Sequence, residues 1–501
     1  MKRVVVIGGG VAGLGAAFRI ARARAAGHDV EVVVVEKSDR IGGKIATDFV
    51  PDPAGGEYVV DGGSDAFVST KPAVRRVART LGIEDDIVPA LDENKRTLIV
   101  KGERLIELPD GIMMFAPTKL LPLATTPLYS WPGKIRMALD LLIPRKERWA
   151  PGETAKDHDE TLESFVVRRM GREALDRVAE PLVGGVHASD PKVMSLAATF
   201  PEFLEMEQKH GSLILGFLEQ RKSREAMKAR QPARPGAKPW SFFNTFVRGM
   251  QTLPDAMAAA IGADRILLSR AAAAVERSGA GWRVALEGGE LLAADAVVVA
   301  VEAWAATKIV EGIDSRIAEL VSEIPCSSSV TVPLAFDESV CPFDKRWHGI
   351  LVPLVEQRPV LAVTLSSSKW PDRTPTGRVL MRGFIGGPQN QHLTEASDED
   401  LIETTRSEIV RMLGMPEDAK PVFARVYRWA GGMPQYTLGH LDRVEEIEGR
   451  CAEIPGFGMA GSAFRGVGIP NCIESGERAA DKVLRELGTE HAEDRSAGPR
   501  R

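Results

Sequence analysis

Residues 2–13 read Lys-Arg-Val-Val-Val-Ile-Gly-Gly-Gly-Val-Ala-Gly, an apolar run that ends in closely spaced glycines. The apolar run predicts a β-strand, and a helical pattern follows it to about Ala26. A second predicted strand, residues 30–35, ends at Glu36. These segments predict a βαβ unit in which the helix N-terminus holds a pyrophosphate and Glu36 accepts a hydrogen bond from a ribose hydroxyl.

The spacing of the glycines makes this prediction specific. Gly8, Gly10 and Gly13 follow the pattern G-x-G-x-x-G, which supplies a tight turn, close backbone approach to the pyrophosphate and close helix packing. The unit alone does not distinguish NAD(P) from FAD. A second basic, glycine-rich turn, Arg40-Ile-Gly-Gly-Lys44, resembles the FAD-binding signature of the amine oxidase-like flavoproteins. We therefore expect FAD as the cofactor.

Composition narrows the function further. The 501 residues carry 64 Lys and Arg against 69 Asp and Glu, a net charge of -5, which argues against a nucleic acid partner. The four cysteines are scattered and predict no metal site or disulfide framework. The N-terminal apolar run lacks the features of a signal peptide, and no stretch of about 18 apolar residues predicts a spanning helix. We expect a cytoplasmic protein.

The segment 113–142 is rich in Leu, Met, Pro and Trp, with interspersed Lys and Arg. One interpretation is a surface that rests on a membrane, which would place the protein peripherally at the inner face of the cell membrane. The interpretation we favour is a buried helix-loop-helix, because an amphipathic pattern is more often part of a core.

Glycine-bearing motifs at both ends of the chain indicate one discontinuous domain. Helical patterns dominate residues 71–218, whereas alternating strands at 330–336, 360–365 and 379–385 predict an antiparallel sheet. We predict an α/β fold (α+β overall) with a discontinuous Rossmann-like FAD-binding domain, an inserted antiparallel-sheet substrate domain and a helical subdomain. The predicted ranges are 1–75, 245–305 and 420–487 for the FAD-binding domain, 85–115 and 306–419 for the substrate domain, 116–230 for the helical subdomain and 488–501 for a mobile tail.

Over residues 2–484 the chain resembles the oxygen-dependent protoporphyrinogen oxidase and coproporphyrinogen III oxidase family. Other amine oxidase-like flavoproteins share the terminal motifs but not the central ones. The central and C-terminal motifs are Gly63-Ser-Asp-Ala-Phe67, Glu180-Pro-Leu-Val-Gly-Gly185-Val-His-Ala-Ser-Asp190, Ser195-Leu-Ala-Ala-Thr-Phe-Pro201, Glu207-Gln-Lys-His-Gly-Ser-Leu-Ile214, Ser366-Ser-Ser-Lys-Trp-Pro371, Met433-Pro-Gln-Tyr-Thr-Leu-Gly-His440 and Gly466-Val-Gly-Ile-Pro-Asn-Cys-Ile473.

The resemblance implies a set of FAD-contacting residues. At two positions the chain departs from the family, since Ala271 stands where Val is usual beside the adenine and Ser64 replaces a usual Pro. The implied cofactor residues are Gly8, Gly9, Gly10, Val11, Ala12, Gly13, Glu36, Lys37, Gly43, Lys44, Gly63, Ser64, Asp65, Ala66, Ala271, Trp429, Gly461, Val467, Gly468 and Ile469.

The resemblance also implies a substrate site with one cation and apolar walls. Arg96 matches the position of a cation that grips a propionate, a task suited to the planar guanidinium fork. Gly185, Leu351 and Phe384 match lining positions. His187 stands where Tyr or Phe is common, and we expect it to serve packing.

The implied reaction is the FAD-dependent oxidation of a porphyrinogen to a porphyrin in haem biosynthesis, with O2 as acceptor and H2O2 as product. Three two-electron steps remove six hydrogens, and no catalytic residue is assigned because the cofactor carries the chemistry. We expect coproporphyrinogen III as substrate, with protoporphyrinogen IX as the alternative, and a monomer or homodimer. The lesser alternatives are a carotenoid desaturase or amine oxidase-like flavoenzyme and a non-catalytic prenyl-GTPase chaperone of the same architecture.

Overall fold

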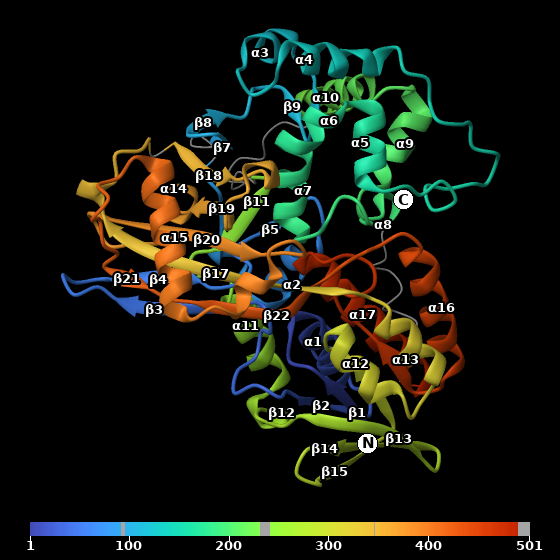
Figure 1. Ribbon diagram of the computed structural model, residues 1–501. Coiled ribbons are helices and arrows are strands. Elements are labelled where there is room, and N and C mark those ends of the chain that lie inside the picture. Colours follow the sequence, from blue (N-terminus) through green and yellow to red (C-terminus); the bar gives the residue numbers. More distant parts are fainter. Residues whose placement is uncertain (92–95, 231–240, 345, 489–501) are drawn as a thin grey trace.

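The computed structural model describes residues 1–91, 96–230, 241–344 and 346–488, without the side chains of residues 184–187 and 224–230. Residues 231–239, whose Pro- and Gly-rich composition predicts a loop, lie outside it, and so does the predicted tail 488–501 apart from Gly488. Figure 1 shows a lower part built on a parallel sheet, an antiparallel sheet beside it and a helical part above. Among the described residues, no helix combines the length and apolar content needed to cross a bilayer.

A five-stranded parallel sheet forms the nucleotide-binding part, and its strand order shows that distant segments meet there. Successive side chains of a strand point to opposite faces, so Val4 and Val6 pack on one side of the sheet, and Val5 and Ile7 on the other. In spatial order the strands are β12 (Ile266–Leu267), β2 (Val30–Val35), β1 (Lys2–Ile7), β16 (Ala296–Val299) and β23 (Phe457–Met459).

Helices cover both faces of this sheet, as expected of a parallel sheet that is buried on both sides. One face packs against α1 (Val11–Ala25), α2 (Ala73–Leu81), α11 (Thr252–Ile261) and α17 (Ile469–Glu486). The other packs against α12 (Ala303–Val310), α13 (Ser315–Ser322), α16 (His440–Glu453) and a small sheet of β13 (Ala272–Ser278), β14 (Gly281–Leu286) and β15 (Leu291–Ala294).

The second part is an eight-stranded, mostly antiparallel sheet. One of its faces packs against α15 (Asp398–Leu413) through a core that includes Leu98, Ile350 and Val363. The strand order is β21 (Phe423–Ala424), β17 (Cys326–Asp337), β20 (Arg378–Gly386), β19 (Val360–Leu365), β18 (Trp347–Leu351), β7 (Arg96–Lys101) and β8 (Arg104–Glu107), and β22 (Tyr427–Pro434) also pairs with β17.

The helical part has its own apolar core, against which Ile99 and Leu351 of the large sheet pack. It therefore covers the sheet face opposite α15. Its elements are β9 (Ile112–Met113), β10 (Ala116–Pro117), α3 (Leu120–Thr125), α4 (Trp131–Ala138), α5 (Leu162–Arg169), α6 (Arg172–Ala174), the π-helical turn η4 (Leu175–Ala179), α7 (Glu180–His187), α8 (Leu196–Thr199), α9 (Pro201–His210) and α10 (Leu213–Arg230).

Short elements join the parts. They are the hairpin β3 (Thr47–Pro51) and β4 (Glu57–Asp61), the sheet of β5 (Phe67–Val68), β11 (Phe243–Phe246) and β6 (Ile87–Pro89), the helix α14 (Ser366–Lys369) and the 3-10 turn η7 (Leu354–Glu356).

Some sequence expectations are confirmed and others differ. The βαβ unit is confirmed, and strands predicted at 330–336, 360–365 and 379–385 lie in the antiparallel sheet. The helical pattern expected from residue 71 is wrong for 87–117, where β6 to β10 lie. Two segments lie in a different part of the molecule from the one that the predicted domain ranges give them. β21 and β22 join the large antiparallel sheet, and α12 and α13 pack on the parallel sheet. Distant pairing decides the positions of β6, β7, β21 and β22, whereas β8 and β9 pair with strands next to them in the sequence.

The segment 113–142 is buried on one side only. Phe115, Leu123 and Met137 lie in the core of the helical part, whereas Leu121, Trp131 and Leu142 are 74%, 66% and 78% exposed. The inner face of this segment is buried, as the helix-loop-helix interpretation expects, and its outer face is exposed.

Candidate functional site

Two glycine turns lie against each other at the carboxyl end of β1. The Gly42 N–H donates a hydrogen bond to the Gly9 carbonyl at 2.8 Å, and a Cβ added to Gly43 would lie 3.0 Å from the Cα of Gly10. Gly8 has φ +109°, in the region that favours glycine. The two motifs separated in the sequence thus form one backbone-lined cradle.

The cradle fits the pyrophosphate of a dinucleotide. Helix α1 starts after Gly10 with no side-chain cap and no acidic residue in its first turn, so Val11 and Ala12 belong to an uncapped, positive helix end. A Cβ on Gly10 would meet nothing nearer than 3.9 Å, which leaves space in front of the turn, whereas one on Gly13 would collide with the Gly8 carbonyl. Gly8 and Gly13 thus have the geometry of a tight turn and of close helix packing, and Gly10 leaves the space that a pyrophosphate would need.

Glu36 lies at the end of β2, beside the first turn. Its carboxylate accepts from Gly9 N–H at 2.6 Å and from Ser38 N–H at 2.8 Å. The Arg270 N–H donates to the Glu36 carbonyl at 2.8 Å, which brings the neighbouring Ala271 to the same strand end. The side chain of the next residue, Lys37, contacts a different group: its ammonium lies 5.0 Å from the ring centre of Trp304.

Further predicted cofactor residues converge from three distant segments. Lys44 donates to the Gly432 carbonyl at 2.6 Å and contacts Ser462 Oγ at 3.3 Å, next to Gly461. The Trp429 indole donates to the Gly62 carbonyl at 3.2 Å, beside Gly63. A second uncapped helix start, Gly468 before Ile469 of α17, follows Val467.

Asp65 ties the cradle to the antiparallel sheet. Its Oδ2 accepts from the Trp370 indole at 3.0 Å and from Lys369 at 3.2 Å, and lies 3.8 Å from Arg382. Burial by itself would raise the pKa of Asp65, but Lys369 and Arg382 outweigh it and lower the pKa well below its usual range. The carboxylate is thus committed to protein partners, while Ser64 is exposed and Ala66 half-buried.

One row of the large sheet carries two of the predicted substrate residues. Leu351 pairs with Ala362, Ala362 with Phe384, and Phe384 with Thr331, so these side chains share one face. Thr331 donates its hydroxyl hydrogen bond to the Gly62 carbonyl, next to the cradle. Phe384 and Leu351 therefore form an apolar wall that begins at the cofactor residues and continues under the helical part.

The structure does not bring the side chain of Arg96, the predicted cation, to this wall, and it leaves the predicted lining role of Gly185 untested. Arg96 shares a strand face with Leu98, which packs on the α15 side, and it pairs with Glu107 at 2.8 Å with 40% of its side chain exposed. Gly185 and His187 belong to α7, above the wall, but their surroundings lie outside the described side chains.

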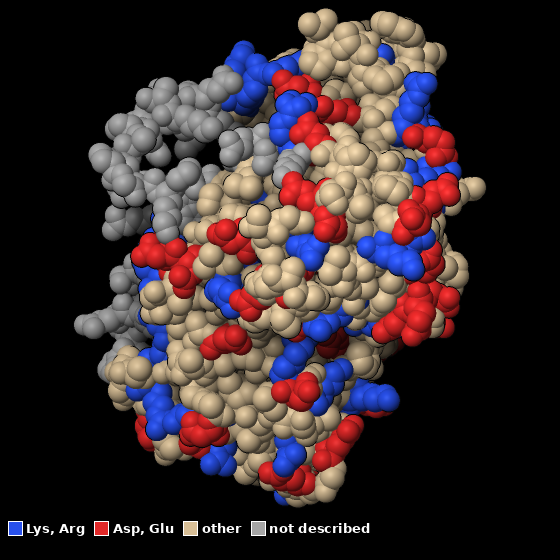
Figure 2. Space-filling view, turned by 90° about the vertical axis from the view of Figure 1, so that its left-hand side faces the viewer, with Lys and Arg blue, Asp and Glu red and all other residues tan. Residues whose placement is uncertain are grey.

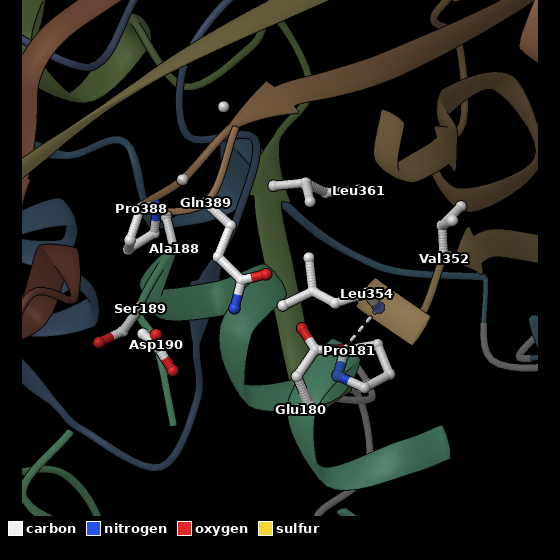
Figure 3. A pocket seen from close by; sticks show the side chains of 12 residues that line it. Glu180, Pro181, Ala188, Ser189, Asp190, Val352, Leu354, Leu361, Pro388 and Gln389 are labelled. Carbon is white, nitrogen blue, oxygen red and sulfur yellow. Dashed lines mark hydrogen bonds between the residues drawn. The ribbon is translucent and has the colours of Figure 1, made fainter. Parts of the chain in front are cut away.

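Sequence reasoning missed residues that position the site. Arg382, 3% exposed, donates to the Gly63 carbonyl at 2.9 Å. Glu180 and Ser189 line a pocket beside the wall (Figure 3). Arg382 and Phe384 lie two positions apart on one strand, so the sequence could have indicated that their side chains share a face. No local sequence pattern indicates the pocket. Among the described residues, no three His, Cys, Asp or Glu side chains gather as a metal site would need.

Comparisons with known proteins agree on one family. A sequence model described as flavin containing amine oxidoreductase matches residues 11–484. The coproporphyrinogen III oxidase of Bacillus subtilis is 31% identical over 498 residues, which cover 96% of this chain and 98% of that protein. That of Propionibacterium freudenreichii is 32% identical, with coverage of 96% and 90%. The crystal structure of a "Putative protoporphyrinogen oxidase" from Exiguobacterium sp. 255-15 superposes with a TM-score of 0.81 at 26% identity, covering 97% and 99%.

Proposed function

Because the chain belongs to the flavin-containing amine oxidoreductases and, within them, to the coproporphyrinogen III and protoporphyrinogen oxidases, we propose that it oxidises coproporphyrinogen III to coproporphyrin III with FAD and O2. The observation that carries the proposal is the direct junction of a dinucleotide cradle with an apolar wall, made by Thr331 and Gly62. A wall of Phe384 and Leu351 suits the apolar faces of the pyrrole rings of a large macrocycle.

The protein's task is mainly to hold and orient. A bound flavin supplies hydride acceptance and transfer of electrons to O2. The uncapped start of α1 and Glu36 hold the dinucleotide, and Phe384 orients the ring. Fixed placement of the reacting carbon removes much of the entropic barrier.

The preference for coproporphyrinogen III rests on the bacterial relatives. Those named coproporphyrinogen III oxidase are 29–32% identical to this chain, and the plant proteins named protoporphyrinogen oxidase are 26–29% identical. A side-by-side assay of both porphyrinogens, followed by porphyrin fluorescence and H2O2 release, tests the choice. We expect faster turnover of coproporphyrinogen III. A preference for protoporphyrinogen IX would reverse the substrate while keeping the reaction, and a flavin-free, inactive protein would favour a chaperone.

We also propose peripheral contact of the helical part with an anionic membrane surface. Figure 2 shows the top of the molecule, where α3 and α4 lie, as largely uncharged. The exposed apolar side chains there are Leu120, Leu121, Trp131, Ile135, Leu139, Leu141 and Leu142. Lys119 lies at one end and Lys146 at the other, and the only acid between them, Asp140, is fully buried. An apolar patch edged by cations suits anionic lipid headgroups.

Co-sedimentation with vesicles tests this contact. We expect binding to phosphatidylglycerol vesicles, weaker binding to phosphatidylcholine, and loss of binding in Trp131→Glu. The matched control is Leu291→Glu, because Leu291 is 58% exposed on β15, away from the helical part. Equal binding by wild type and Trp131→Glu would contradict the proposal.

A further inference from the structure

A pocket of about 380 Å³, including its open mouth, lies where the helical part meets the large sheet. Both ends of α7 contribute to it, Glu180 and Pro181 at the start and Ala188 to Asp190 after the last turn. Figure 3 shows Glu180 beneath Leu354 and Leu361, with Ser189 and Asp190 to one side. The pocket thus combines apolar walls with a few polar groups, as ligand sites do.

The pocket continues the apolar wall of the site. Gly386 of the pocket lies two positions beyond Phe384 on β20 and therefore on the same face of the sheet, and Leu361 and Val352 are sequence neighbours of the wall residues Ala362 and Leu351. At about 3.3 Å per residue, two positions correspond to about 7 Å along a strand. A macrocycle that packs on Phe384 therefore extends to the mouth of this pocket.

The charges of the pocket select one kind of group. Glu180 and Asp190 line it, and the described residues that line it include no Lys or Arg. A propionate would be repelled there, whereas an N–H donor would be attracted. Ser189 supports this, because its Oγ is buried and has no hydrogen-bond partner among the described residues.

Glu180 has a carboxyl oxygen available for such a donor. Its Oε2 accepts the Leu354 N–H at 3.0 Å, the one hydrogen bond that the described residues make to this group. This contact holds α7 against η7 and fixes the orientation of the carboxyl group. The other oxygen, Oε1, accepts no hydrogen bond from the described residues and is available to a donor in the pocket.

On the basis of the proposed function, we propose that Glu180 accepts the pyrrole N–H proton of the bound porphyrinogen. In each step the N–H bond would break and its electron pair would form a C=N bond, while the meso C–H pair would leave as a hydride, for which a bound flavin would be the acceptor. The proton passes to Glu180 and then to water through the open mouth. One hydride and one proton leave per step, so three steps consume three O2 and give three H2O2. The macrocycle then carries one N–H and one meso CH2 group, and a proton shift from that meso carbon to a ring nitrogen completes the porphyrin. The tetrahedral meso carbons bend the macrocycle, which lets N–H groups point out of its mean plane.

The electrostatics of Glu180 suit this role. Burial raises the pKa of Glu180 to about 7, helped by Asp176 and Asp190 and opposed by the Leu354 N–H. The other charged groups on the packed elements, Arg177 on η4 and Glu356 on η7, pair with each other. A base whose pKa lies near the working pH is well matched to proton transfer.

The test is Glu180→Gln in the flavin-loaded full-length protein. The Gln amide oxygen still accepts the Leu354 N–H, so we expect an unchanged melting temperature, unchanged flavin content and coproporphyrin III binding within threefold of wild type. We expect kcat to fall about 100-fold and the rise of kcat through pH 7 to disappear. The matched control, Glu276→Gln, makes the same change at an exposed carboxylate on β13, away from the pocket, and should change kcat less than threefold.

Several results would overturn the inference. An unchanged kcat and pH profile in Glu180→Gln would overturn it and leave the proposed function standing. Loss of the pH 7 limb in Asp190→Asn instead would transfer the role to Asp190. A flavin-loaded wild type that oxidises neither porphyrinogen would overturn the proposed function and this inference together.

Discussion

The nucleotide cradle and the substrate wall meet at one hydrogen bond, between Thr331 and Gly62, yet they are built in opposite ways. The cradle consists of backbone from residues 8–13 and 42–44, close in the sequence. The wall consists of side chains that β-sheet register brings together from β17 to β20. Backbone sites depend on local conformation and on missing side chains, whereas the wall depends on strand pairing between residues up to 53 positions apart, from Thr331 to Phe384. The two regions should therefore fail differently when they are mutated.

The largest expected effect is in the cradle. Gly10→Val places a branched side chain in the open space before the first turn of α1, where the pyrophosphate would lie. We expect loss of flavin, measured as the flavin absorbance of the purified protein, and at least 100-fold weaker binding on reconstitution. Gly449→Ala is the control, because a Cβ there meets nothing within 4 Å. Full flavin content in Gly10→Val would show that the cradle does not hold the cofactor.

The next effect is at the junction of the two regions. Asp65→Ala leaves Arg382 and Lys369 without their shared carboxylate, and breaking a buried pair typically costs about 3–5 kcal/mol. Urea unfolding at pH 7 measures it. The lowered pKa of Asp65 means that its stabilisation is present above the unfolded pKa of about 3.9 and is lost as the pH falls. The difference between wild type and variant should therefore narrow below about pH 4, and a constant difference would contradict the ion-pair role.

The same contrast explains how far the sequence could predict the molecule. Gly8, Gly10, Gly13 and Glu36 were predictable because one short segment carries the whole βαβ geometry. Glu180 was not, since its chemistry arises from η7 and β20, which approach α7 only in the folded chain. Local patterns also misassigned residues 87–117 as helical, because β7 is defined by its pairing with β18.

A smaller effect is expected within the wall. Phe384→Ala removes one aromatic face, a contact worth roughly 0.5–1.5 kcal/mol beyond its buried area. We expect a two- to tenfold fall in kcat/KM for both porphyrinogens, because they share the ring, with full flavin content. Phe49→Ala is the control, since Phe49 is exposed on β3. Loss of flavin together with activity would place Phe384 in the cofactor site instead.

The smallest expected effect is at Arg96, where the resemblance and the geometry disagree. The resemblance predicts a propionate clamp, but Arg96 lies on the α15 side of β7 and pairs with Glu107, with 40% and 48% of the two side chains exposed. An exposed pair of this kind contributes about 0–1 kcal/mol. We therefore expect Arg96→Ala to change the KM for coproporphyrinogen III less than twofold at low salt.

Glu107→Ala is the control for this prediction. If Arg96 only pairs with Glu107, this variant should also leave KM unchanged. If Arg96 is a propionate clamp, removal of Glu107 would free it to bind the propionate more tightly, and KM would fall. A tenfold rise in KM for Arg96→Ala with a fall for Glu107→Ala would show that Arg96 reaches around the strand to the substrate. One residue of the substrate site would then be predictable from a local sequence motif, as the cradle is. The contrast between local and long-range construction would then apply only to the wall.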